Sequence, residues 1–186
     1  MDLMDALRGR RAIREYTAEP VPHAVLSELM AAAVLAPSAM NLQPWAFAVA
    51  EGAERLAGYS DRAKGHVLAG MTADSPLARY RDRLADPGFH IFHHAPALVI
   101  VCAIADESQS REDCCLAGLS LMLAAHARGL GTCWIGFARL WLNRPETKAE
   151  LGIPAEYSPV APIVVGHPKV APAPTPRDQP RVMWCT

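Results

Sequence analysis

The chain has 186 residues, of which 51% are hydrophobic and 20% are charged, and its formal net charge is −1. This length and composition predict a single domain over residues 1–186 with a core of its own. The near-zero charge gives no reason to expect nucleic acid or an anionic membrane as a partner. Charged residues interrupt the N-terminal segment and no apolar run is long enough to span a bilayer, so we expect a cytoplasmic protein.

The first third of the chain is predicted to contain two helices. Apolar residues on one side predict a short helix over 1–8. Prolines at positions 20 and 22 exclude a helix between them. An apolar stripe then predicts a second helix over 23–35, which Pro37 ends.

The middle of the chain is less regular. A strand is predicted over 45–50, followed by a helix over 51–63 that Gly58 breaks. Residues 64–90 are polar and contain several glycines and prolines, so we expect a mobile loop with one helix over 76–84. Such segments often cover a site, and plain surface packing explains this one equally well.

Strands dominate the expectations for the second half. Continuous apolar runs predict strands over 97–103 and 160–166, each buried on both faces. A further strand or extended segment is expected over 130–135. Pro145 suits the first turn of a short helix over 144–151.

Between these strands lies a long apolar stretch around which the chain is organised. Ser110 with Asp113 resembles a capping box and predicts a helix start, and Gly129 predicts a left-handed exit. The residues between are apolar or small on every face, so the helix must be buried on every face. A second subunit is the natural cover for it in so small a chain.

The predicted fold class is α+β, a small mixed β-sheet flanked by helices, because strands and helices follow no steady β-α-β rhythm. The only G-x-G, Gly129-Leu-Gly131, follows a helix, which excludes a dinucleotide-binding fingerprint. Residues 167–186 are proline-rich and predict an extended arm that ends in an apolar hook, Val182-Met183-Trp184.

Metal and disulfide chemistry are not expected. The five cysteines are an odd number without a C-x-x-C pattern, which indicates reduced and mostly buried thiols. His90, His93 and His94 lack a carboxylate or cysteine at ligand spacing, so no metal site is predicted.

Three clusters are candidates for binding. Arg10, Arg11 and Arg14 suit a phosphate, because guanidinium groups bind phosphate oxygens at two points and stay charged; arginines at a helix end also complement its dipole. Two further clusters, one in the loop 37–45 and one at the exit 131–136, have equally simple structural explanations.

In the loop, Ser38, Asn41 and Gln43 either meet a polar ligand edge or cap backbone groups. At the exit, glycines either let the backbone approach a flat ligand or make a simple turn. No nucleophile–base pair is recognisable, so an enzymatic function would take its reactivity from a cofactor.

Taken together, these clusters resemble the nitroreductase family of flavin mononucleotide (FMN) oxidoreductases. The resemblance rests on five motifs in order: Arg10-Arg-Ala-Ile-Arg14-x-Tyr16, Pro37-Ser-Ala-Met-Asn-Leu-Gln-Pro-Trp45, Leu123-Ala-Ala-His-Ala-x-Gly-Leu-Gly-Thr-Cys-Trp-Ile-Gly136, Val165-Gly-x-Pro168 and Pro176-Arg177. It covers most of the chain except about 51–89. It implies an intertwined homodimer with FMN at the subunit interface, a buried central helix, and an arm over 167–186 that packs on the partner subunit.

The resemblance also implies roles for individual residues. Arg10 and Arg14 would hold the FMN phosphate with Arg11 beside them, and Arg177 would add a contact. The flavin would be lined from the other subunit by a second group: Pro37, Ser38, Asn41 and Gln43. Ile135 and Gly136 would lie against the flavin near N5, with the Gly136 N–H as donor, and no side chain would be catalytic.

Two departures from the family pattern stand out. Ala12 replaces a serine whose hydroxyl commonly helps to bind phosphate in the family. The region after Trp45, where relatives place a residue on the pyrimidine edge of the flavin, does not match the family pattern. Lys64 and Arg62 are the candidates for that position.

The activity that the resemblance implies is ping-pong hydride transfer from NADH or NADPH, through flavin N5, to a flat electrophile such as a nitroaromatic or a quinone. Two alternatives stay open: a flavin store or sensor without NAD(P)H turnover, and a family member that uses reduced flavin for oxygen-dependent chemistry.

Overall fold

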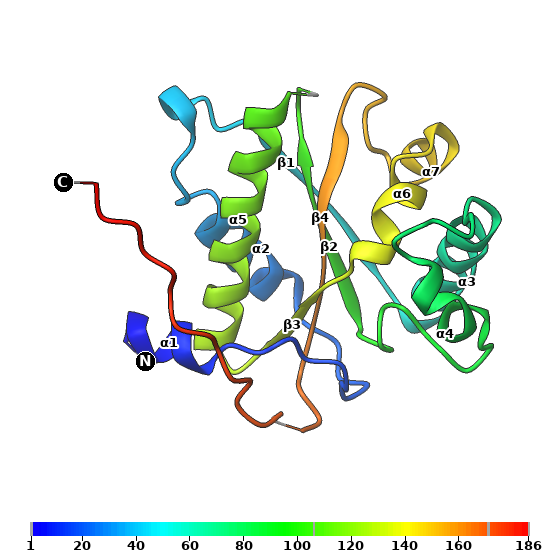
Figure 1. The fold of residues 1–186 in the computed structure, drawn as a ribbon, viewed down its shortest axis with the longest axis horizontal. Coiled ribbons are helices and arrows are strands. Elements are labelled where there is room, and N and C mark those ends of the chain that lie inside the picture. Colours follow the sequence, from blue (N-terminus) through cyan, green and yellow to red (C-terminus); the bar gives the residue numbers. More distant parts are fainter. Residues whose placement is uncertain (1, 106, 171, 186) are drawn as a thin grey trace.

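A single four-stranded sheet forms the centre of the protein (Figure 1). The computed structural model describes residues 2–105, 107–170 and 172–185. The strand order is β1-β2-β4-β3, and every neighbouring pair is antiparallel. The strands are β1 (Trp45–Glu51), β2 (Ala97–Ala103), β3 (Gly131–Trp134) and β4 (Ser158–Gly166). A parallel bridge between Ala12 and Thr132 adds the N-terminal segment beside β3. The predicted α+β class is confirmed.

The strand β2 divides the interior into two cores. All seven of its residues are buried, as its continuous apolar sequence predicted. Because side chains alternate along a strand, Val99 and Val101 face one core, whereas Leu98 and Ile100 face the other.

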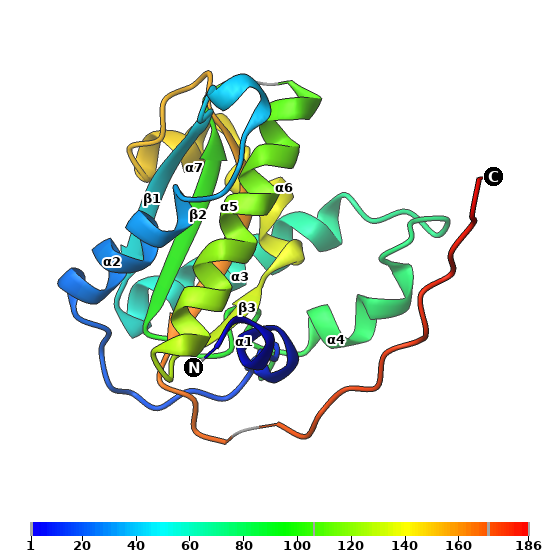
Figure 2. The ribbon, with the colours of Figure 1, turned by 90° about the vertical axis from the view of Figure 1, so that its left-hand side faces the viewer.

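Helices cover both faces of the sheet (Figures 1 and 2). One face carries α2 (His23–Ala33) and α5 (Ser108–Ala127), and the short α1 (Leu3–Gly9) packs near the end of α5. The other side holds α3 (Ala53–Ala69), α4 (Arg81–Ala85), α6 (Arg139–Leu142) and α7 (Pro145–Glu150). The described chain also has three short 3-10 helices: η1 (Ala39–Asn41), η2 (Ala78–Tyr80) and η3 (Gly136–Ala138).

The helix α5 differs at its start from the sequence-based expectation. It begins at Ser108, so Ser110 lies inside it and the predicted capping box is wrong. The Asp113 carboxylate instead accepts the backbone N–H of Ala39 at 3.3 Å and the side-chain amide of Gln109 at 3.2 Å. The exit is as predicted, because Gly129 has φ 76°.

One side of α5 is apolar and exposed in the single chain. Leu116 and Leu119 are 43% and 40% exposed, and Cys115 lies beside them on the exposed side. The opposite side packs into the sheet through residues such as Ala117 and Leu121. The chain by itself therefore does not bury this helix on every face.

The helix α3 is longer than expected. The predicted break at Gly58 does not occur, and the helix also passes through Gly65, which belonged to the expected loop. Neither glycine has a neighbour where a Cβ would stand. Buried Leu56, Ala63 and Val67 supply an apolar stripe that outweighs the weak helix propensity of glycine.

The C-terminal segment leaves the body of the protein after a short anchored stretch. Tyr16 forms a bridge with Pro168, and the N–H of Lys169 donates to the Glu15 carbonyl. Residues 172–185 are all exposed and extend away from the body (Figure 2). Trp184 at the end is 86% exposed.

Two further findings concern the whole of the described chain. All five cysteines are free thiols, and Cys102, Cys114 and Cys133 are buried. None of the helices in residues 2–105, 107–170 and 172–185 has the length and hydropathy required to cross a membrane.

Candidate functional site

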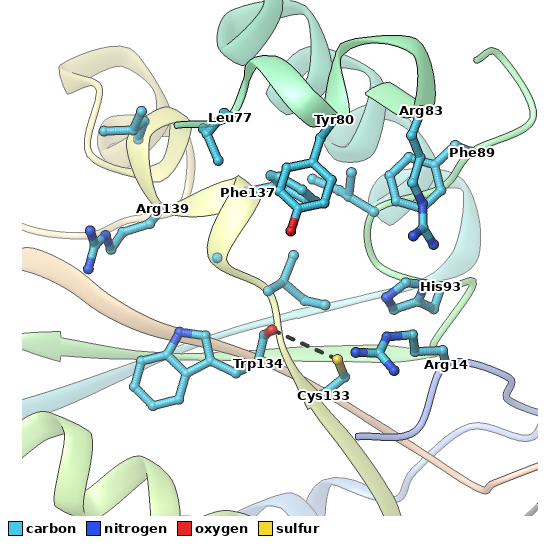
Figure 3. Close-up of a pocket in the computed structure, with 14 residues that line it drawn as sticks. Arg14, Leu77, Tyr80, Arg83, Phe89, His93, Cys133, Trp134, Phe137 and Arg139 are labelled. Atoms are coloured by element: carbon cyan, nitrogen blue, oxygen red, sulfur yellow. Dashed lines mark hydrogen bonds between the residues drawn. The ribbon is translucent and has the colours of Figure 1, made fainter. Parts of the chain in front are cut away.

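A cavity of about 770 Å³ opens where β3 ends and η3 begins (Figure 3). Its volume lies in the range typical of small-molecule sites, roughly 300–1,000 Å³. The residues that line it come from the N-terminal segment, the 77–93 region, the exit of β3, η3 and α6: Arg14, Leu77, Tyr80, Arg83, Phe89, Ile91, His93, Cys133, Trp134, Ile135, Gly136, Phe137, Arg139 and Leu140.

The exit of β3, residues 133–136, forms one side of this cavity. We call these four residues the floor. Cys133 and Ile135 are only 5% and 3% exposed, and the Ile135 N–H donates to the Pro162 carbonyl at 2.8 Å. Gly136 is exposed, and a Cβ there would meet nothing within 4 Å. Among the described residues no hydrogen bond occupies its N–H. The floor is therefore fixed in the sheet and presents an open backbone donor.

Arg14 reaches the cavity because the N-terminal segment runs along β3. The Ile13 N–H donates to the Thr132 carbonyl at 2.9 Å, and the Tyr16 hydroxyl donates to the Ile13 carbonyl at 2.8 Å. A Cβ on Gly131 would stand 2.7 Å from Ile13, so this close approach requires glycine. The resemblance implies Arg14 at the FMN phosphate and Ile135 and Gly136 against the flavin ring; in the structure all three line the same cavity.

Arg10 and Arg11 lie in a neighbouring cavity. The helix α1 ends at Gly9, so Arg10 and Arg14 do not lie on one helix. Arg10 and Arg11 line a second cavity of about 260 Å³, together with His126 and Thr132. The Nε of Arg11 is buried without a hydrogen-bond partner among the described residues. The Arg11 guanidinium is otherwise held by its own segment, because Nη1 donates to the carbonyls of Arg8 and Arg10.

The two cavities are electrostatically linked through Cys133. Burial raises the pKa of its thiol, and the positive charges of Arg14 and Arg10 oppose that shift. Both arginines therefore act on the same part of β3, although they line different cavities.

Residues 77–89 form the outer wall of the large cavity. The ring of Tyr80 meets the Phe137 ring edge-on at 5.5 Å, and the Arg83 guanidinium lies 4.5 Å from the Phe89 ring centre. Leu84, 1% exposed, anchors α4 in the core. The sequence indicated only that the 64–90 region could cover a site; Tyr80, Arg83 and Phe89 were missed.

Lys64 and Arg62 support the surroundings of the cavity and do not line it. Lys64 is 7% exposed, and its ammonium group donates a hydrogen bond to the Phe89 carbonyl at 2.8 Å. Arg62 pairs with Glu150 at 2.7 Å. Neither residue is a candidate for the pyrimidine edge of a flavin within this chain.

His93 is a neutral member of the cavity lining. Burial lowers its pKa to about 4, and the nearby charges of Arg14 and Arg83 act in the same direction. His90 has a pKa of about 4 for the same main reason, with a contribution from His94, whose ring centre lies 4.3 Å away. The described residues contain no group of three or more His, Cys, Asp or Glu side chains that could hold a metal ion.

The loop 37–43 and Arg177 are not brought to either cavity in a single chain. Pro37, Asn41 and Gln43 are exposed, and the Ser38 hydroxyl accepts the Gln43 N–H at 2.9 Å. Arg177 is exposed on the arm, and the one hydrogen bond of its side chain within the described part of the chain goes to the Pro176 carbonyl.

Residues 7–167 match the model of the nitroreductase family. The chain belongs to this family. Its curated relatives include a putative NADH dehydrogenase/NAD(P)H nitroreductase of Methanothermobacter thermautotrophicus, 29% identical over 90% of this chain and 78% of that protein. A 5,6-dimethylbenzimidazole synthase of Rhodospirillum rubrum is 32% identical over 90% of this chain and 83% of that protein.

Solved structures have the same nitroreductase fold. A nitroreductase with bound FMN from Bacteroides fragilis superposes with a TM-score of 0.81 at 24% identity, over 100% of this chain and 98% of that one. An oxidised iodotyrosine deiodinase bound to FMN and 3-iodo-L-tyrosine superposes with a TM-score of 0.76 at 26% identity, over the full length of both chains.

Proposed function

We propose that this nitroreductase-family protein binds FMN at the exit of β3 and transfers hydride from NADH or NADPH to a flat electrophilic acceptor by a ping-pong mechanism. One observation carries the proposal: a cavity of about 770 Å³ in which Arg14 lies beside an apolar floor that ends in the open N–H of Gly136. Relatives whose names specify NAD(P)H, and two solved structures that hold FMN, support it.

The residues present fit a flavin. A floor of Cys133 and Ile135 is apolar, and the glycine at its end leaves room for the close approach of an aromatic ring. Arg14 supplies a permanent positive charge to the electron-rich side of such a ring, and the Gly136 N–H supplies a donor. Bound FMN would itself supply the two-electron hydride chemistry at N5.

The second cavity suits the phosphate of the cofactor. Arg10 and Arg11 line it and would offer guanidinium donors to the phosphate oxygens. Because Ala12 has no hydroxyl group, arginine side chains and backbone N–H groups would bind the phosphate.

We further propose a homodimer in which the partner completes the site. The exposed Leu116 and Leu119 of α5 and the exposed end of the arm are apolar surfaces that a second copy would bury. In that arrangement the partner contributes Pro37, Ser38, Asn41 and Gln43 to the flavin. Residues 167–186 would pack on the partner and bring Arg177 to the phosphate, so that residues 1–186 form one domain with an exchanged arm.

The overall reaction balances without a catalytic side chain. With a nitroaromatic acceptor, NAD(P)H, one proton and the nitro compound give NAD(P)⁺, a nitroso compound and water. With a quinone, the same two electrons and two hydrogens give the hydroquinone. The single proton that accompanies the hydride would come from solvent, because no aspartate or glutamate among the described residues lines the cavity and burial lowers the pKa of His93 to about 4.

The first experiment is a visible spectrum of protein that has been incubated with FMN and desalted, followed by anaerobic addition of NADH and of NADPH. We expect about one flavin per chain and rapid bleaching with at least one nucleotide. Arg14→Gln should lose flavin, whereas Arg55→Gln, on the exposed side of α3 away from the cavity, should retain it. Protein that holds no flavin contradicts the proposal.

The same spectrum separates the two alternatives. Flavin that no pyridine nucleotide bleaches indicates a store or sensor. Flavin that is consumed after reduction and exposure to oxygen indicates oxygen-dependent chemistry.

The dimer has its own test by sedimentation velocity. Leu119→Glu places a charge on the exposed apolar side of α5 and should give monomers with weakened FMN binding. Ala53→Glu adds the same charge at the exposed start of α3 and should leave the assembly unchanged. A wild-type monomer that binds FMN at full strength would contradict the partner's role.

A further inference from the structure

The large cavity carries a positive charge that the cofactor alone does not require. Three arginines line it, Arg14, Arg83 and Arg139, and none of its lining residues is an aspartate or glutamate. A guanidinium group stays charged at any working pH. The cavity therefore favours an anionic occupant over a neutral one of the same shape.

Arg83 is the arginine whose charge is available on the outer wall. It forms no ion pair with a carboxylate among the described residues, in contrast to Arg62 and Arg128, which pair with Glu150 and Glu28. The Phe89 ring beneath its guanidinium orients the group at a centroid distance of 4.5 Å. Figure 3 shows the Arg83 side chain turned into the cavity towards His93.

Tyr80 supplies an aromatic surface on the same wall. Its ring is positioned by the edge contact with Phe137 at 5.5 Å, and its hydroxyl points into the cavity (Figure 3). A flat ring between Tyr80 and the floor would thus have aromatic contact on one side. An anionic substituent on that ring could reach Arg83, three residues along the chain from Tyr80.

We propose that the acceptor is a planar aromatic carboxylate whose ring packs beside Tyr80 and whose carboxylate binds Arg83. This inference rests on the proposed function, which places FMN on the floor side of the cavity with Arg14. The carboxylate and Arg83 form a charge-assisted, two-point contact of the kind that arginine geometry favours. Arg83 then determines which acceptors bind, whereas Arg14 serves the cofactor.

The phosphate groups of FMN and NAD(P)H are other anions that Arg83 could bind, so the test separates the three. Binding of 4-nitrobenzoate and of 4-nitrobenzyl alcohol to the oxidised, FMN-loaded protein is measured by titration calorimetry. The FMN dissociation constant and the rate of reduction by NADH and NADPH are measured in parallel. The variants are Arg83→Gln, Arg83→Lys, Arg139→Gln and a matched control, Arg79→Gln.

Arg79 is a suitable control because it is also an exposed arginine stacked on an aromatic ring, 4.9 Å from the Tyr80 centroid, but it does not line the cavity. We expect the wild type to bind 4-nitrobenzoate about 10- to 100-fold more tightly than the alcohol, the usual gain from a hydrogen-bonded charge pair. Arg83→Gln should remove this preference, Arg83→Lys should restore part of it, and Arg79→Gln should keep it.

Three results overturn the inference: equal binding of both probes by the wild type, the same loss in Arg83→Gln and Arg79→Gln, or a preference that Arg139→Gln removes and Arg83→Gln does not. If Arg83→Gln instead weakens FMN binding or slows reduction by NAD(P)H with the preference intact, Arg83 belongs to a phosphate, and the inference is also wrong. A wild type without flavin shows instead that the proposed function has failed.

Discussion

The two sides of the large cavity are built differently. The floor, residues 133–136, continues a strand of the central sheet, and its Cys133 and Ile135 are almost completely buried. The outer wall, residues 77–89, consists of a 3-10 turn, a helix of five residues and loops, with Leu84 as its only fully buried side chain. One side is part of the core, whereas the other is attached to it.

This difference assigns different tasks to the two sides. A surface that belongs to the sheet stays in place and suits the part of the site that must be rigid, the cofactor platform. A wall with few buried contacts opens at a lower free energy than the core and suits the binding and release of changing ligands. The predictions below test this division, beginning with the largest effect.

Truncating the floor should destabilise the whole domain. Ile135→Ala removes a side chain that is 3% exposed and should lower the free energy of unfolding by about 2–5 kcal/mol. Urea unfolding followed by circular dichroism measures the loss. Ile135→Val should cost roughly 0.5–1.5 kcal/mol, and a similar small loss for alanine would show that the floor is not part of the core.

Truncating the anchor of the outer wall should act locally. Leu84→Ala creates a cavity beneath α4, and such a substitution destabilises the packing there by about 2–5 kcal/mol. We expect this loss to lower the free energy of local opening of residues 77–89. Limited proteolysis in this segment should then become roughly 30-fold faster or more, the rate equivalent of about 2 kcal/mol. If cleavage is unchanged and the urea midpoint falls as far as in Ile135→Ala, the wall unfolds only with the domain.

Removing the charge beside the floor should weaken FMN binding and leave the stability of the fold almost unchanged. Arg14 is exposed, so Arg14→Gln should change the free energy of unfolding by no more than about 0.5 kcal/mol. The free energy of FMN binding should fall by about 1.5–3 kcal/mol, the contribution of a hydrogen bond to a charged group. Fluorescence titration with FMN measures this loss, and an unchanged affinity would remove Arg14 from the cofactor site.

The last prediction concerns His93, which lies between the two sides and whose effect vanishes at neutral pH. Burial lowers its pKa to about 4, whereas an unfolded histidine titrates near 6.5. Between these values the unfolded chain binds more protons, so stability should fall as pH decreases from about 6.5 to 4. The urea midpoint of His93→Gln should vary less steeply in this window than that of the wild type, and identical slopes would contradict the shift.

The sequence was most informative where burial is complete. The strand β2 occupies the predicted residues 97–103, because an apolar run buried on both faces has few alternative structures. The same holds for the floor, where a strand or extended segment was predicted over 130–135 and β3 covers Gly131–Trp134.

The predictions were wrong where contacts between residues distant in sequence determine the local structure. Asp113 resembled a cap, but it bonds the Ala39 N–H, 74 residues away in the chain. The continuity of α3 through Gly58 depends on the packing of its buried side, which a local helix-breaking rule does not include. The outer wall was missed because its residues are mostly polar and exposed, and only the folded chain shows that Tyr80 and Arg83 face the floor.

The burial of β2 has a consequence for the synthesis of the protein. Its sequence, Ala-Leu-Val-Ile-Val-Cys-Ala, has high β-propensity and contains neither charge nor proline, which is the composition of aggregation-prone segments. Its neighbour β1 precedes it in the chain, but β4 emerges from the ribosome only at Ser158–Gly166. Until then one edge of β2 stays open to pairing with other chains, so chains that end before Ser158 should precipitate, whereas removal of the arm should leave a soluble product.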